Sequence, residues 1–165
     1  MPEPTRVPAG LRLNQAARTV ERAFDEALAA AGGTLPVWLI LLNLKIRKPG
    51  NQRELAAAVG IRDATLTHHL NAMEADGLVT RTRDAANRRV SVVGLTEAGD
   101  AAFLRLRDAA IAFDARLRTG LDDAELDQLD RLLSQLAANA GSGSGAVGAT
   151  DGQAGTPWAG LAERP

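Results

Sequence analysis

The chain has 165 residues, of which 45% are hydrophobic and only 3% aromatic, and its formal net charge is −1. Because alanine and leucine favour helices, whereas strands favour β-branched and aromatic residues, this composition favours packed helices over a β-sandwich. The sequence contains no cysteine, which excludes disulfides, thiolate metal sites and cysteine-based redox switches.

The chain is predicted to begin with two helices. Apolar residues recur at three- and four-residue steps over residues 11–31, which predicts an amphipathic helix preceded by a flexible N-terminus at 1–10. Thr34 is suited to cap a second helix, with Pro36 tolerated in its first turn. Residues 37–44 are apolar on nearly every side, as expected of a buried central helix.

Two short helices are predicted next, over residues 51–59 and 64–76. Asn51 followed by Glu54 resembles a capping box at the start of the first, and Asp63 can cap the second. The second helix is expected to bury the three apolar side chains of one face: Leu66, Leu70 and Met73.

A basic β-hairpin is predicted to follow these helices. Residues 78–82 and 90–93 are short β-prone runs that bracket the polar segment 83–89. The wider segment 43–96 has nine Lys or Arg and five Asp or Glu, a net charge of +4, so the rest of the chain carries −5. Because nucleic-acid affinity depends on local charge, the slightly negative total does not exclude it.

The C-terminal part is predicted to contain two more helices and a tail. A long helix resumes at Glu97, and Asp122 with Glu125 resembles a capping box before a last helix with a leucine stripe. Residues 141–165 are rich in glycine, alanine and serine and are expected to form a disordered tail. A G-x-G-x-x-G match at 143–148 has neither a strand before it nor a helix after it, so we interpret it as accidental.

Two short helices followed by a basic hairpin are typical of a winged helix-turn-helix, in which the second helix enters the major groove. On the outer side of that helix, the candidate DNA-binding residues have hydrogen-bonding side chains suited to base edges and phosphates: Thr65, Thr67, His68 and Asn71. On the hairpin, the candidates are arginines that can reach the backbone or a narrow minor groove: Arg83, Arg88 and Arg89. The alternative is an ordinary helical hairpin with a polar outer face, followed by a solvated arginine-rich turn.

The segment 51–99 also resembles a known family. The wing of MarR-type transcription regulators reads D-x-R-x-x-x-V-x-L-T-x-x-G, and five residues of this chain match it in register: Arg89, Val93, Leu95, Thr96 and Gly99. Upstream, the run from Met73 to Arg81 also fits the family pattern. The resemblance covers about residues 11–138.

This resemblance implies a mainly α fold with a small β-hairpin wing. It places a winged helix-turn-helix at 34–96 and dimerisation helices at 11–31 and 98–138, within one domain spanning 11–140. It implies a homodimeric repressor that binds a near-palindromic double-stranded DNA operator and is released by a small-molecule effector. Trp38, in the apolar helix, is interpreted as a core residue, although the same region borders the effector pocket in this family, so a pocket role is the alternative.

Two departures from the family pattern concern the DNA-binding region. Asn87 stands where the family has its wing aspartate, so the aspartate–arginine pair that would orient the wing has a neutral partner here. His68 stands where an arginine is usual, and His69 where an apolar residue is usual. These differences bear on which operator sequence is recognised and on the pH dependence of binding.

No enzyme, metal or cofactor site is predicted. Consecutive helical residues point about 100° apart, so His68 and His69 cannot readily hold one metal ion, and no nucleophile–base pair is evident. With no signal-peptide pattern and no apolar run long enough for a membrane span, we expect a cytoplasmic protein without membrane association. Two alternatives to a ligand-released repressor stay open, namely a winged-helix protein that senses nothing and a helical protein-interaction module that does not bind DNA.

Overall fold

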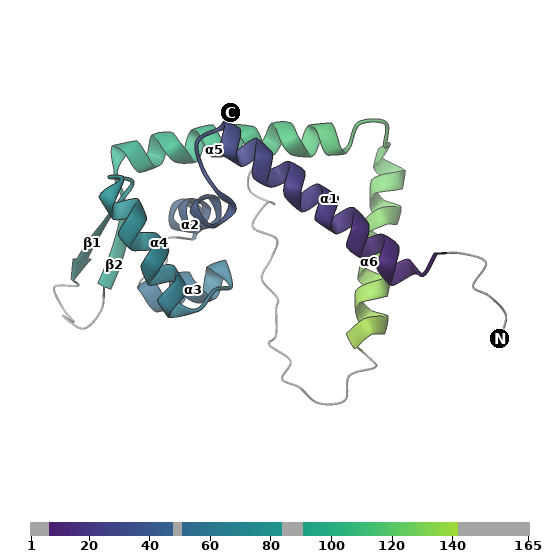
Figure 1. Cartoon of the computed structure of the whole chain (residues 1–165), viewed down its shortest axis with the longest axis horizontal. Coiled ribbons are helices and arrows are strands. Elements are labelled where there is room, and N and C mark those ends of the chain that lie inside the picture. Colours follow the sequence, from purple (N-terminus) through teal and green to yellow (C-terminus); the bar gives the residue numbers. More distant parts are fainter. Residues whose placement is uncertain (1–6, 48–50, 84–90, 142–165) are drawn as a thin grey trace.

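The computed structural model describes residues 7–47, 51–83 and 91–141, which form six helices and one two-stranded antiparallel sheet (Figure 1). In chain order the elements are α1 (Ala9–Ala30), α2 (Leu35–Ile46), α3 (Gln52–Val59), α4 (Asp63–Ala75), β1 (Val79–Arg83), β2 (Ser91–Leu95), α5 (Glu97–Leu117) and α6 (Asp123–Gly141). The prediction of a mainly helical fold with a small β-hairpin is confirmed.

The elements are arranged along the long helix α5. Figure 1 shows α2, α3, α4 and the hairpin beneath the first half of α5, while α1 approaches its second half and α6 turns away from its end. The ring centroids of Phe24 in α1 and Phe113 in α5 lie 5.0 Å apart, which joins these two helices. The helix-turn-helix and α6 therefore lie at opposite ends of the molecule.

The centre of the core is α2. Its side chains Trp38, Ile40 and Leu41 are fully buried, as its almost uniformly apolar sequence predicts. This helix packs against α1, α3, α4, α5 and β2. The ring of Trp38 stacks on that of Phe103 in α5 with centroids 5.7 Å apart. Through α2, the helix-turn-helix is thus held on the long helix α5.

Most of the predicted helix starts are confirmed. The Thr34 side chain accepts a hydrogen bond from the Val37 amide, and the Asn51 side chain accepts one from the Glu54 amide at 2.9 Å. Before α6, the side chain of Asp122 accepts from the Glu125 amide, and the Glu125 carboxylate accepts from the Asp122 amide.

Two predicted helix starts were wrong. Residue Asp63 is not a cap but the first residue of α4, where its negative charge lies in the first turn and interacts favourably with the helix dipole. At the N-terminus, α1 begins at Ala9, so two residues expected to be flexible belong to the helix. The carbonyl of Pro8 accepts hydrogen bonds from the amides of Leu11 and Arg12, which explains the earlier start.

The junction between β2 and α5 is tightly packed against the end of α4. The Thr96 hydroxyl lies 2.6 Å from the carbonyl oxygen of Gly77 and accepts a hydrogen bond from the Gly99 amide at 2.9 Å. Gly99 is buried, and a Cβ atom added to it would overlap the carbonyl oxygen of Leu78. The first turn of α5 therefore rests directly on the turn that follows α4.

The cap of α3 can be tested by replacing Asn51 with alanine. This change removes the acceptor for the Glu54 amide, and loss of such a cap costs about 1 kcal/mol of stability. We expect chemical denaturation to show a lower midpoint with an unchanged slope. Asn51→Ser, which keeps an acceptor for the Glu54 amide and a donor for the Glu54 carboxylate, should stay close to the wild-type midpoint, and equal loss in both variants would contradict the capping role.

Candidate nucleic-acid interface

The turn between α3 and α4 sets the orientation of the second helix. Gly60 ends α3 in the left-handed conformation, with φ of 78°, which a residue with a side chain rarely adopts. The amides of Gly60 and Ile61 both donate to the carbonyl of Ala56, which closes the end of α3. The chain can then enter α4 after only two further residues, as a helix-turn-helix requires.

One face of α4 is buried and the other is open. The predicted buried residues Leu66, Leu70 and Met73 are at most 1% exposed. Thr65, His68 and Asn71 follow one another at three-residue steps, and all three are exposed. Three of the four predicted recognition-helix residues therefore share a solvent-facing surface.

The fourth predicted residue, Thr67, has a hydroxyl that is engaged within the protein. It donates to the carbonyl of Asp63 at 2.8 Å and accepts a hydrogen bond from the Gln52 side chain at 2.7 Å. Because Gln52 belongs to α3, this contact joins the two helices of the helix-turn-helix. Thr67 keeps acceptor capacity, but its proton is directed into its own helix.

Arg81 was not among the predicted site residues, yet it joins the hairpin to α4. Its Nε and Nη2 donate to Oε2 of Glu74 at 3.0 and 2.5 Å, and Nη2 also donates to Oδ1 of Asn71 at 2.6 Å. The hydrogen bond from Arg81 holds the pKa of Glu74 below its usual value. Glu74 thus stays ionised at neutral pH, and the pair is lost only as the pH falls through that lowered pKa.

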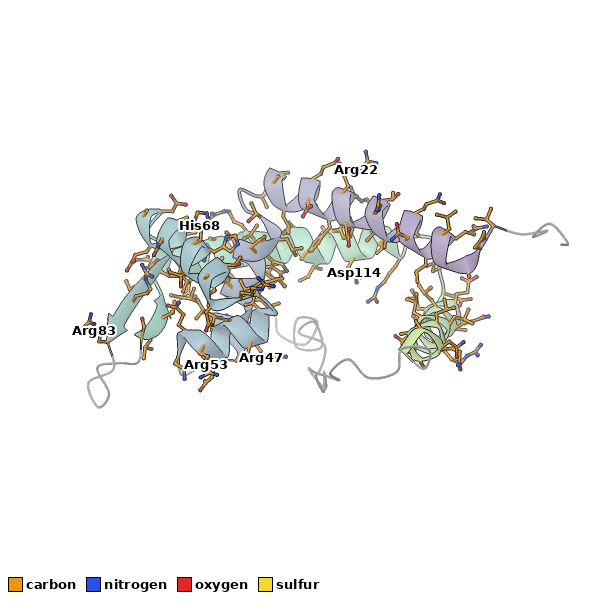
Figure 2. All side chains as sticks on the ribbon, turned by 60° about the horizontal axis from the view of Figure 1, so that its bottom comes forward. Arg22, Arg47, Arg53, His68, Arg83 and Asp114 are labelled. Carbon is orange, nitrogen blue, oxygen red and sulfur yellow. The ribbon has the colours of Figure 1, made fainter. Side chains whose placement is uncertain are left out.

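Further exposed arginines lie on α3, at the start of α4 and on β1. Figure 2 shows Arg83 at the far end of β1, His68 on α4 and Arg53 on α3. Arg53, Arg62 and Arg83 are exposed, and none of them makes an ion pair with another described residue. Arg53 and Arg62 were missed as site residues, although the local excess of positive charge had pointed to this segment. Asn87, Arg88 and Arg89 lie outside the described residues.

Trp38, the predicted effector-pocket residue, is fully buried between α2 and α5. A shallow cavity of about 230 Å³ lies elsewhere, between α1 and α5, and its lining includes Val20, Phe113 and Arg116. The Arg116 guanidinium lies 5.3 Å from the centroid of the Phe113 ring. The structure therefore places the predicted pocket residue and this cavity in different parts of the fold.

The described parts of the chain lack two other kinds of feature, a metal-ligand cluster and a single membrane-spanning helix. There, no three His, Asp or Glu side chains gather as metal ligands would. Nor does any single helix of these parts have the length and apolar composition of a membrane span; only α1 and α2 together, bent by 74° where they meet, satisfy that test.

Comparisons with known proteins agree with this geometry. The family model described as the MarR family matches residues 34–91. A structure of the transcriptional repressor CouR bound to a 23-mer DNA duplex is 33% identical, with a TM-score of 0.68, over 81% of this chain and 92% of that one. The transcriptional regulator PA3341 is 30% identical, with a TM-score of 0.64, over 81% of this chain and 98% of that one.

A further structure is that of CouR from Rhodococcus jostii RHA1 bound to p-coumaroyl-CoA. It is 26% identical, with a TM-score of 0.63, and the match covers 78% of this chain and 90% of that one. The likeness to these structures extends beyond the matched segment 34–91 to most of the chain. Regulators of this family are non-enzymatic DNA-binding proteins, consistent with the expectation that the chain is not an enzyme. The chain belongs to the MarR family of transcriptional regulators.

Proposed function

We propose that this protein is a homodimeric repressor that binds a near-palindromic DNA operator and releases it when a small molecule binds. The observation that carries the proposal is the open face of α4, where Thr65, His68 and Asn71 are exposed opposite a fully buried apolar face. A recognition helix needs this division, because it must pack on its own domain and still present hydrogen-bonding groups to base edges.

The charge around this face supports DNA as the partner. Arg53, Arg62 and Arg83 are exposed near α4 without an ion-pairing partner among the described residues, so their charges are available to phosphates. The repressor CouR, which shares 33% identity, was solved with a DNA duplex. From the sequence, Arg88 and Arg89 are expected to add two further cations on the hairpin.

The distribution of apolar side chains supports a dimer. None of the residues of α6 is buried. Its leucines Leu126, Leu129, Leu133 and Leu136 recur at alternating steps of three and four, the spacing of a helix that packs along a partner helix. Within the described chain, exposed large apolar side chains other than Ile46 lie on or beside α1, α5 and α6. A second copy that covers this surface would bury it, and a two-fold arrangement would place two recognition helices side by side.

Release by a small molecule is proposed from the relatives and from the packing of α2. A second relative, CouR from Rhodococcus jostii RHA1, which shares 26% identity, was solved with p-coumaroyl-CoA. In this chain α2 contacts both α5 and the helix-turn-helix, so a ligand that displaces α2 near Trp38 would change the spacing of the two recognition helices.

The operator itself is the first test. We expect the purified protein to select a near-palindromic sequence from a random duplex library, with half-sites about 10 base pairs apart. His68→Ala should weaken binding to that duplex by roughly 1–3 kcal/mol per half-site if His68 reads a base, with a smaller effect on a scrambled duplex. Fluorescence anisotropy on both duplexes measures this difference.

His69→Ala is the matched control, because His69 is the next residue on the same helix and is partly buried, whereas His68 is exposed. We expect it to leave the preference for the selected duplex unchanged. Binding should also weaken steeply as salt concentration rises. Salt-insensitive binding without sequence preference would contradict the repressor proposal and favour the protein-interaction module.

A further inference from the structure

The contact between the hairpin and the recognition helix determines how Asn71 can read DNA. Resting on the proposed DNA-binding function, we propose that Arg81 is a positioning residue that turns the amide oxygen of Asn71 away from DNA. Asn71 then acts at the interface as a hydrogen-bond donor. It selects acceptors, such as a phosphate oxygen or the N7 and O6 atoms of guanine, instead of reading adenine with both amide atoms.

The orientation of the Asn71 amide follows from the chemistry of its partner. An arginine side chain has only donors, so the Asn71 atom at 2.6 Å from Nη2 of Arg81 must be the carbonyl oxygen. The NH₂ group is then at the other end of the planar amide of Asn71, and the residue is exposed to solvent. Arg81 therefore determines which end of Asn71 is available to a ligand.

Glu74 holds Arg81 in this position. Two donors of the same guanidinium, Nε and Nη2, reach a single carboxylate oxygen of Glu74, which restrains the arginine between α4 and β1. The Arg81 side chain is 24% exposed and that of Glu74 is 41% exposed, so the pair lies at the surface next to the proposed interface. Arg81 thereby also balances a carboxylate that would otherwise repel phosphates.

This arrangement has a consequence for specificity. An asparagine that reads adenine must accept a hydrogen bond from N6 and donate one to N7 at the same time. Turning the oxygen of Asn71 toward a base edge would weaken its charge-assisted bond to Arg81. A guanine or a phosphate, which offers only acceptors to this residue, is compatible with the bound orientation.

The decisive variant is Asn71→Asp. The new carboxylate keeps an acceptor for Arg81, so the melting temperature should stay equal to that of the wild type or rise. The outward donor is replaced by an acceptor, so affinity for the duplex selected by the wild-type protein should fall at least tenfold per half-site. Wild-type affinity of Asn71→Asp, within a factor of about two, would overturn the donor role.

A double-mutant cycle tests the role of Arg81. Asn71→Ala and Arg81→Ala should each weaken binding to the selected duplex by about tenfold per half-site, and the double variant should be little weaker than either. Arg81→Lys keeps the positive charge but not the planar guanidinium with its several donors. It should restore less than half of the binding free energy that Arg81→Ala loses. Thr80→Ala, at an exposed position of the same strand, is the control and should bind like the wild type.

The outcomes distinguish the inference from the function on which it rests. If the effects of Asn71→Ala and Arg81→Ala multiply to about a hundredfold, the two residues act independently and the positioning role is wrong. A wild-type protein that selects no duplex at all would overturn the proposed function and this inference together. If Arg81→Ala loses affinity only because its melting temperature is lower, Arg81 has a structural role and not a positioning role.

Discussion

Replacing Leu129 and Leu133 together with glutamate is expected to convert the dimer into monomers and to lower operator affinity by about 10²–10⁴-fold. Both side chains are more than a third exposed in the single chain, at 47% and 40%, so the change should not unfold it. In the dimer they would lie in the interface, where buried carboxylates without partners are strongly unfavourable. Because a dimer binds two half-sites at once, losing it removes the avidity of the second site.

The control adds the same two negative charges to the other side of α6. At 100° per residue, Ala124 and Ser134 lie away from the leucine stripe, so Ala124→Glu with Ser134→Glu should leave assembly and affinity unchanged. Sedimentation equilibrium measures the mass against twice the chain mass of 17.3 kDa. A wild-type protein that sediments as a single chain at micromolar concentration would refute the dimer.

Gly99→Ala is expected to destabilise the protein by about 3 kcal/mol or more, above the usual cost of overpacking a core. The added methyl group would overlap the carbonyl oxygen of Leu78, a backbone atom that cannot rotate away as a side chain would. The Thr96 hydrogen bonds to Gly77 and Gly99 cross the same junction and would be strained as well. A melting temperature lower by roughly 10 °C should follow.

Gly10→Ala is the matched control for this change. Gly10 lies in the first turn of α1 with no atom within 4 Å of an added Cβ, and alanine is the better helix former. We expect its melting temperature to equal or exceed that of the wild type. If Gly99→Ala melted like Gly10→Ala, the close approach of α5 to the turn after α4 would be refuted.

The sequence by itself determined the elements and their order. Helical periodicity and caps such as Asn51 and Thr34 are local signals, because each depends on residues within one or two turns. The same signals predicted which face of α4 is buried, since Leu66, Leu70 and Met73 recur at helical spacing. The order of the elements, together with the match in the wing, then indicated the family.

The tertiary structure alone decided which polar groups of the site are available. Thr67 and Asn71 are both polar residues predicted to lie on the outer side of α4. In the structure, however, the Thr67 hydroxyl donates to the carbonyl of Asp63, and the Asn71 oxygen accepts from Arg81. The Arg81 contact spans ten residues and two elements, so it depends on the angle between α4 and β1. No helical or strand period encodes that angle. It follows from how the turn after α4 packs against the first turn of α5, where Gly99 allows the backbones to approach.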